Sequence, residues 1–378
     1  MKYIKLIKNI HELLPSLQAM WNTRVNENKD HLQLAGRWLL YSQTINNDGG
    51  YAHSYSLYNG WEKSYPETTG YIIPTMLSLG KYLNDDRYTA SALKAGKWLL
   101  EIQQPDGSYY DLSGQKQIFD TGQILEGLIA LYKRTGDEKF LDAAIKAGNF
   151  LGENQDTDGK WTTFSYNNHP HAYYSRVSAN LLKLFEVTGE STYKSAAETN
   201  LHWTVKQQTE NGYFNFMSFA PSELPYLHTI IYVLEGLWGS YKILQRNDIF
   251  KSLKKSIDTL LRISKDRDVV LYARYDENWR HVRKERCLVG LAQWAGLLLD
   301  LFSTTHEQNY YDQAVKTITY LKTKQIQKGS NNIIGAIPGS TPLWGSYFGF
   351  SFNNWTVKFF IDVLLRLEQI QRQGDTSQ

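Results

Sequence analysis

Residues 146–161 read KAGNFLGENQDTDGKW, a helix end followed by a turn and an aromatic side chain. Gln155 ends the helical pattern, Asp158 and Gly159 form a strong turn signal, and Trp161 follows. Residues 94–110, KAGKWLLEIQQPDGSYY, repeat this order with Tyr109 in the aromatic position, and residues 35–51, AGRWLLYSQTINNDGGY, are a looser copy. Self-similarity at a regular spacing predicts a repeat architecture.

An aromatic residue after an acidic or polar pair marks the start of each repeat. It recurs at steps of 52, 53, 57 and 60 residues, at Tyr88, Phe140, Tyr193, Phe250 and Tyr310. With an incomplete first copy there are six units, over about residues 32–86, 87–138, 139–191, 192–248, 249–309 and 310–369.

Each unit reads as two helices. In the first, Ala92, Ala95, Leu99 and Ile102 fall on one face at helical spacing, and the second is more apolar, as in residues 122–136. We therefore predict an all-α fold, an (α/α)6 toroid of about six helical hairpins, as a single domain over residues 1–378. The more charged helices should lie outside and the apolar ones inside. An open solenoid is the alternative, but neither end shows the polar capping repeat that it would need.

The repeat with Gln155 and Trp161 resembles the QW motif of squalene and terpene cyclases and related toroids, and as architecture the likeness covers most of the chain. In those families the motif joins a helix end to a turn, so the resemblance implies a toroid and structural roles for these residues. Other users of this ring act on carbohydrates, among them unsaturated uronyl hydrolases, glycosidases, sugar 2-epimerases, polysaccharide lyases and the C-terminal domain of glucuronyl C5-epimerases.

Composition excludes several other classes of protein. A net charge of +3 predicts no nucleic-acid partner, since that requires a basic stripe or cluster. Cys287 is the one cysteine, which excludes an internal disulfide and a cysteine-rich metal site. We predict no metal, no cofactor, no membrane span and a cytoplasmic location, with residues 1–17 forming a first helix rather than a signal peptide. The oligomeric state is left open.

Polar side chains stand where each inner helix should begin. Because equivalent positions in a ring point toward one mouth, we expect these residues to converge there. Tyr, His and Arg are not preferred helix caps, which favours a functional reading of the set over a capping one. The set is Glu67, Asp120, Tyr174, His228, Arg286 and Asn354.

Glu67 and Asp120 should lie on neighbouring inner helices, and paired carboxyl groups with different pKa values are the usual tools of glycosidic chemistry. The arrangement resembles the unsaturated uronyl hydrolases, which carry an Asp on each of two successive inner helices and hydrate the vinyl ether of an unsaturated uronate. The resemblance implies that Asp120 is the general acid/base and Glu67 its partner, although Glu67 replaces the family's Asp.

A second mechanism uses other members of the set. Lyases and C5-epimerases of uronates neutralise the sugar carboxylate, remove the C5 proton and deliver another. Tyr174 and His228 would be base and acid. The cations that could neutralise the carboxylate are Arg176, Arg274 and Arg286.

Residues 335–355, GAIPGSTPLWGSYFGFSFNNW, are too rich in Gly, Pro and aromatic residues for a helix. We expect a loop folded over the ring mouth, with Trp344, Tyr347 and Trp355 as sugar platforms. Trp61 and Tyr65 of the first unit should face them when the ring closes.

We therefore predict a carbohydrate-active enzyme that acts on an acidic, uronate-containing glycan or oligosaccharide, with a hydrolase favoured over a lyase or a uronate C5-epimerase. A non-catalytic toroid that binds a glycan or protein is the alternative from another class. An isoprenoid cyclase ranks last, because the only adjacent Asp pair, Asp85 and Asp86, falls in a turn between units.

Overall fold

The computed structural model describes residues 9–266 and 270–375. Its helices are α2 (Ile10–Met20), α3 (Asn28–Thr44), α4 (Pro66–Leu83), α5 (Asp86–Ile102), α6 (Ile118–Thr135), α7 (Glu138–Glu153), α8 (Ser175–Thr188), α9 (Ser191–Lys206), α10 (Leu227–Leu244), α11 (Asn247–Asp266), α12 (Leu288–Thr305), α13 (Gln308–Lys324) and α14 (Asn354–Asp375). The strands are β1 (Ser54–Ser56), β2 (Gly60–Trp61), β3 (Arg286–Cys287), β4 (Ser340–Thr341) and β5 (Ser351–Asn353).

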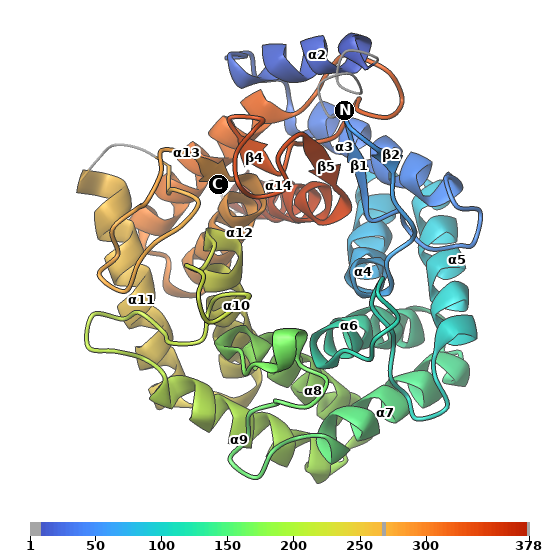
Figure 1. The fold of residues 1–378 in the computed structure, drawn as a ribbon, viewed down its shortest axis with the longest axis vertical. Helices are drawn as coiled ribbons and strands as arrows, with labels where there is room; N and C mark the ends of the chain where they lie inside the picture. The colour runs from blue at the N-terminus through green and yellow to red at the C-terminus, as the bar shows by residue number, and fades with distance from the viewer. Residues whose placement is uncertain (1–8, 267–269, 376–378) are drawn as a thin grey trace.

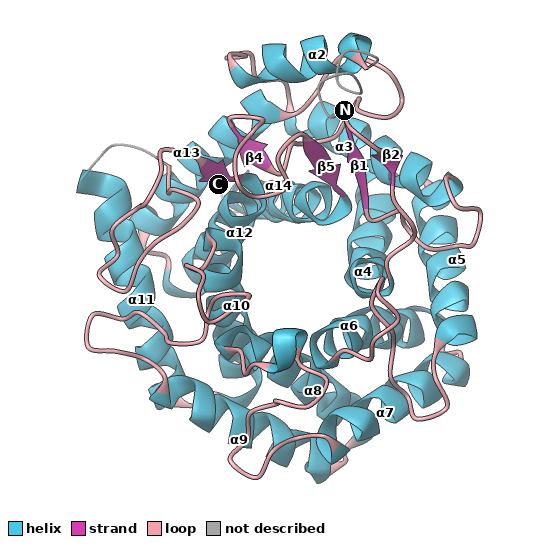
Figure 2. Ribbon diagram, viewed as in Figure 1, coloured by secondary structure: helices cyan, strands magenta, loops and turns pink. Residues whose placement is uncertain are grey.

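The helices form two concentric layers around a closed ring (Figures 1 and 2). Among the described residues, the inner layer consists of α4, α6, α8, α10, α12 and α14, and the outer layer of α3, α5, α7, α9, α11 and α13. Neighbouring inner helices pack along the whole circuit, and α14 returns to contact α4. The (α/α)6 toroid predicted from the repeats is confirmed, as is the placement of the apolar helices inside.

The core lies between the two layers. On α5 the predicted apolar face is buried at Ala92, Ala95 and Leu99, while Ile102 is half-buried at the helix end. Small residues on the outer helices allow close approach, because a Cβ added to Gly96 of α5 would lie 2.1 Å from Cδ1 of Leu131 on α6. The alternation of alanine, glycine and leucine thus sets the spacing between the layers.

Within the described residues, a repeated glutamine joins neighbouring outer helices at five of the six junctions in the ring. Gln103 Nε2 donates to the carbonyl of Ala143 on α7 at 2.8 Å, and Gln155 Nε2 donates to the carbonyl of Ala196 on α9 at 2.9 Å. Each amide also donates to the carbonyl of its turn glycine, Gly107 or Gly159. The motif read from the sequence is therefore a hydrogen-bonded connection between neighbouring units.

Three further glutamines make the same connection. Gln43 bonds to Gly49 and Ser91, Gln208 to Gly212 and Ser252, and Gln325 to Gly335 and His31. In the fourth unit the two adjacent glutamines differ: Gln208 makes these bonds, whereas Gln207 Nε2 donates to the carbonyl of Trp203.

Three features close the ring. Gln325, which follows the last outer helix, donates to the carbonyl of His31 on α3 at 3.0 Å. The helix α14 packs on α3 and α4. Strand β5 pairs antiparallel with β1 in the sheet β2–β1–β5, in register Tyr55 to Phe352. These contacts join the end of the chain to its beginning, so the solenoid alternative is wrong.

The first described helix, α2, lies outside the ring (Figure 1). It begins at Ile10, and residues 1–8 of the predicted first helix lie outside the described residues. One described helix, α12, is apolar and long enough to cross a membrane by length and composition alone, over Leu288–Thr305. In the structure 72% of that segment is buried, because α12 is an inner helix packed between α10 and α14.

Candidate active site

A cavity of about 410 Å³ lies where several inner helices begin. The first turns of α4, α6, α10 and α14 contribute to its walls, together with the loops before α6, α8, α10 and α14. The residues that line it are His53, Tyr65, Glu67, Thr68, Tyr71, Gln117, Phe119, Asp120, Tyr166, Asn167, Tyr173, Phe219, Ala220, Glu223, Tyr226, His228, Tyr232, Ser346, Tyr347, Phe348 and Trp355.

Two buried carboxyl groups share one phenol in this cavity. Glu67 follows Pro66, the first residue of α4, and Asp120 occupies the first turn of the neighbouring helix α6. The Tyr65 hydroxyl donates to Oδ2 of Asp120 at 2.8 Å and also hydrogen-bonds with Glu67. The structure thus brings together the two carboxyl groups that the sequence paired, with Tyr65 between them.

Burial controls the charge of this pair. It raises the pKa of Glu67 well above its usual range, and the negative charge of Asp120 raises it further. Burial also raises the pKa of Asp120 to about 7, against the hydrogen bond from Tyr65, which lowers it. Burial thus favours the neutral form of Glu67, whereas Asp120 can gain or lose a proton near pH 7.

A buried imidazole faces the same cavity. His228, the second residue of α10, has a ring centroid 4.2 Å from that of Tyr232 and 5.6 Å from that of Tyr347. Burial lowers the pKa of His228 to about 3, so the ring is neutral at pH 7. Its Nδ1 lies 2.6 Å from Oε1 of Gln293 on α12.

Aromatic side chains form most of the remaining wall. Trp355 packs against His53 with ring centroids 4.7 Å apart and against Phe348 at 4.9 Å. Trp355 Nε1 donates to the Tyr347 hydroxyl at 2.9 Å. These rings offer flat apolar faces with hydroxyl groups between them, which suits the faces and hydroxyls of a sugar.

Apart from the three arginines, four of the predicted residues do not line the cavity. Tyr174 is fully buried, and its hydroxyl accepts hydrogen bonds from Ser165 Oγ and the backbone N–H of Tyr166. The short 3-10 helix over Ala172–Tyr174 shifts the register, so Tyr173 takes the cavity position instead. Sequence spacing could not reveal this one-residue change.

The other three have structural or external positions. Asn354 Nδ2 donates to the carbonyl of Ala52 and to Thr68 Oγ1, which ties α14 to the first unit. Trp61 packs on Trp38 and Tyr55 in the wall of the first unit. Trp344 is 56% exposed and lies outside the set of lining residues.

None of the three predicted arginines lines this cavity. Arg274 stands behind its wall, with the guanidinium 3.8 Å from the ring centroid of Tyr226 and a hydrogen bond to the Tyr226 hydroxyl. Arg286 stacks on Tyr272 at 3.7 Å. Arg176 lies on the other side of the cavity floor, where its guanidinium covers Tyr232 at 4.5 Å.

The sequence missed several lining residues, notably His53, Tyr71, Phe119, Tyr173, Tyr226 and Tyr232. His53 precedes β1, and burial lowers its pKa to about 4. Nothing in the local pattern separates these aromatic residues from the many that pack the core. In the described part of the chain, no three His, Cys, Asp or Glu side chains gather as a metal site requires.

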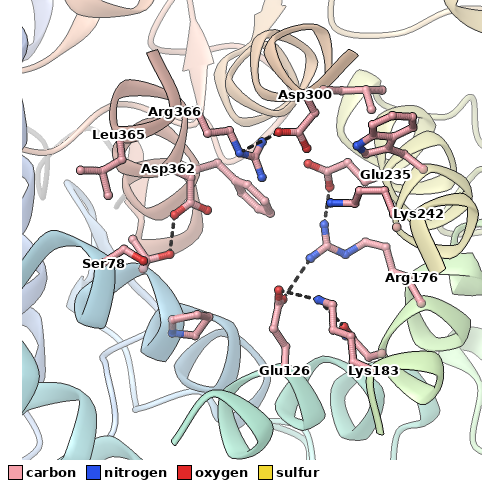
Figure 3. Close-up of a pocket in the computed structure, with 18 of the residues that line it drawn as sticks. Ser78, Glu126, Arg176, Lys183, Glu235, Lys242, Asp300, Asp362, Leu365 and Arg366 are labelled. Atoms are coloured by element: carbon pink, nitrogen blue, oxygen red, sulfur yellow. Dashed lines mark hydrogen bonds and ion pairs between the residues drawn. The ribbon is translucent and has the colours of Figure 1, made fainter. Parts of the chain in front are cut away.

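A second cavity, of about 580 Å³, is lined by residues of the inner helices, many of them charged (Figure 3). Arg176 lies between Glu235 and Glu126, and forms ion pairs with both. Lys183 pairs with Glu126 at 2.9 Å, and Arg366 pairs with Asp300 at 3.3 Å. Acids and bases are thus matched within this cavity.

Sequence comparison gives one family match. The model of the squalene-hopene cyclase C-terminal domain matches residues 61–236, somewhat less than half of the chain. None of the curated proteins compared with the chain matches it.

Solved structures match the whole ring. An unsaturated glucuronyl hydrolase specific for heparin has 16% identity and a TM-score of 0.74, with 91% of this chain and 98% of that chain covered. The unsaturated glucuronyl hydrolase from Bacillus sp. GL1, responsible for the degradation of glycosaminoglycan, has 16% identity and a TM-score of 0.72 over 91% and 97%. A cellobiose 2-epimerase from Bacillus thermoamylovorans has 14% identity and a TM-score of 0.69 over 90% and 98%. The chain therefore has the (α/α)6 toroid fold that these hydrolases and epimerases share.

Proposed function

We propose that this protein is a carbohydrate-active enzyme, a hydrolase in which Asp120 is the general acid/base and Glu67 its partner. The observation that carries the proposal is the buried carboxyl pair, joined by the Tyr65 hydroxyl in an aromatic cavity. A catalytic group is most effective when its pKa lies near the working pH, and burial brings the pKa of Asp120 to about 7.

The two carboxyl groups differ in pKa, so that one can exchange a proton while the other supports it. Protonated Asp120 would deliver its proton to the sugar, and the resulting carboxylate would take a proton from the attacking water. The neutral form of Glu67 is favoured, because burial and the charge of Asp120 both raise its pKa. It therefore acts as a hydrogen-bond donor that supports the charge which develops on Asp120.

A uronate-containing glycan is the substrate class we propose. Arg274 is the predicted arginine that brings a positive charge up behind the cavity wall, because it stacks on Tyr226, which lines the cavity. Several of the structural neighbours are unsaturated glucuronyl hydrolases, which supports the same class.

An epimerase is the second candidate, since a neutral imidazole shares the cavity with the carboxyl pair. His228 could remove a proton from the sugar and Asp120 could return one. Cellobiose 2-epimerases among the structural neighbours support this alternative. A lyase would need the same base together with a cation at the sugar carboxylate.

An isoprenoid cyclase has the support of the family match and of the aromatic walls. The polar groups in the cavity oppose it. Seven of the lining residues are tyrosines, and Glu67, Asp120 and His228 stand among them. Such walls suit a hydroxylated ligand better than a hydrocarbon.

The test uses an unsaturated uronyl disaccharide and follows the ultraviolet absorbance of its conjugated double bond. A hydrolase removes this absorbance, a lyase acting on a saturated uronate oligosaccharide creates it, and an epimerase changes neither. We expect the wild type to remove it and Asp120→Asn to be slower by about a hundredfold or more. Asp106→Asn is the control, because Asp106 lies in the turn before α6 and outside the cavity. Tight binding without turnover of any glycan would instead favour a non-catalytic binding toroid.

A further inference from the structure

A chain of hydrogen bonds crosses the floor between the two cavities. His228 Nδ1 lies 2.6 Å from Gln293 Oε1, and Gln293 Nε2 donates to Glu235 Oε2 at 2.9 Å. The same oxygen of Glu235 accepts from Arg176 Nη1. Residues of α10, α12 and α8 thus connect the imidazole in the candidate active site to the ion pairs shown in Figure 3.

Glu235, at the far end of this series of hydrogen bonds, fixes the orientation of the Gln293 amide. Glu235 forms an ion pair with Arg176, and an ionised carboxylate can only accept hydrogen bonds. The NH2 of Gln293 must therefore face Glu235, and its carbonyl oxygen must face His228. If the amide were reversed, two oxygens would meet at Glu235 with no proton between them, which costs about tenfold or more in population.

The glutamine in turn fixes the imidazole. A carbonyl oxygen accepts, so Nδ1 of His228 must carry the proton, and in a neutral ring Nε2 then keeps its lone pair. His228 is buried beside the Arg176 charge, and both effects oppose a second proton. Within the described residues Nε2 has no hydrogen-bond partner, while the ring lines the cavity.

We propose that Gln293 is a positioning residue, held by Glu235 and Arg176, which keeps His228 as the tautomer with Nε2 unprotonated and open to the substrate. Arg176 therefore acts through this chain and not as a contact for the substrate. The assignment of a substrate-facing base rests on the proposed function, whereas the tautomer itself does not.

The chemistry of His228 follows from this tautomer. Nε2 can accept a hydrogen bond from a sugar hydroxyl or take its proton, so that the O–H bond breaks and an N–H bond forms. The imidazolium that results keeps its Nδ1–H bond to Gln293. A neutral ring of this tautomer has no proton on Nε2, so His228 cannot begin the reaction as a general acid.

Nuclear magnetic resonance tests the tautomer without any substrate. The full-length protein is labelled with nitrogen-15 histidine, and His228→Asn identifies the signals of the His228 ring. We expect Nδ1 to appear as the protonated nitrogen and Nε2 as the unprotonated one, with at least a tenfold excess over the reverse tautomer. A wild-type ring protonated at Nε2, or an even mixture, overturns the proposal.

Variants separate positioning from packing. Glu235→Gln replaces an obligate acceptor with an amide that can donate or accept, so Gln293 can turn over and both tautomers should become populated. Gln123→Leu is the matched control, because Gln123 is another buried inner-helix glutamine that contacts Arg176 through its Oε1 but does not bond to His228. It should leave the His228 signals unchanged. If Glu235→Gln folds but keeps the wild-type tautomer, the relay is wrong. If the tautomer is as expected and no glycan is turned over, the proposed function fails while the relay stands.

Discussion

Replacing Asp120 with asparagine should stabilise the protein at high pH and leave its stability unchanged in acid. In the unfolded chain the pKa of this carboxyl is about 3.8, and burial raises it to about 7 in the fold. Between these values the unfolded state releases a proton that the folded state retains, so Asp120 reduces stability as pH rises through this window. The full difference corresponds to about 4 kcal/mol at most.

The variant removes this penalty without removing the hydrogen bond. The amide oxygen of an asparagine can still accept from the Tyr65 hydroxyl, as Oδ2 of Asp120 does. We expect the free energy of unfolding, measured by urea denaturation, to rise by about 2–4 kcal/mol near pH 8 and by about zero near pH 4. An equal change at both pH values, or a loss of stability near pH 8, would refute a raised pKa for Asp120.

Asp106→Asn is the control with the opposite sign. Burial works against ionisation of Asp106, but hydrogen bonds from Lys116 and Ser108 outweigh it and hold the pKa below its usual range. Its contribution is therefore present near neutral pH and is lost as pH falls through the folded pKa. Removing this carboxylate should destabilise the protein near pH 7 and have little effect in acid.

Three further predictions concern the ring and its electrostatics. Trp161→Ala should cost about 3–5 kcal/mol of unfolding free energy in urea, because Trp161 is fully buried and Nε1 donates to the carbonyl of Leu151; a loss below about 1 kcal/mol would contradict this role. Gln325→Leu should speed amide hydrogen exchange in α3 and α14 more than Gln103→Leu does, because Gln325 closes the ring; equal effects would place the closure elsewhere. Arg176→Met should raise the pKa of Glu67 further, measured by carbon-13 resonances of the carboxyl group, because the Arg176 charge lowers that pKa; an unchanged value would mean that the charge does not reach Glu67.

The repeat made the fold predictable. Five copies within the described residues preserve a physical function, in which a glutamine amide bonds to a turn glycine and to the next outer helix. Gly107 shows why the pattern is strict, since it has φ +86 and an added Cβ would lie 2.1 Å from the carbonyl oxygen of Lys146. Because the same few residues form the turn and the hydrogen bond between units, their repetition in the sequence predicts the ring.

The candidate site was predictable only where a helix start fixed the position. Glu67, Asp120 and His228 stand in the first turns of inner helices, and the structure places all three in one cavity. The same reasoning failed for Tyr174, because a 3-10 helix before α8 shifts the register by one residue. It also failed for Arg176, because this side chain, on the second residue of α8, reaches the other cavity.

Partners across the ring were beyond the reach of sequence spacing. Gln293 and His228 are 65 residues apart, and no repeat relates them. The choice of tautomer depends on Glu235 and Arg176 in turn, so it appears only when three helices are placed together. Long-range networks of this kind require the structure.

The central claim is that Asp120 and Glu67 process a glycan, and turnover in heavy water tests it most directly. Purified protein is incubated in heavy water with saturated and unsaturated uronate oligosaccharides, and the masses of the products are measured by mass spectrometry. We predict the mass of an added heavy water, with cleavage of the unsaturated sugar, in the wild type and in Asp106→Asn, and none in Asp120→Asn or Glu67→Gln. The same mass change in folded Asp120→Asn and Glu67→Gln, at the wild-type rate, would contradict the claim.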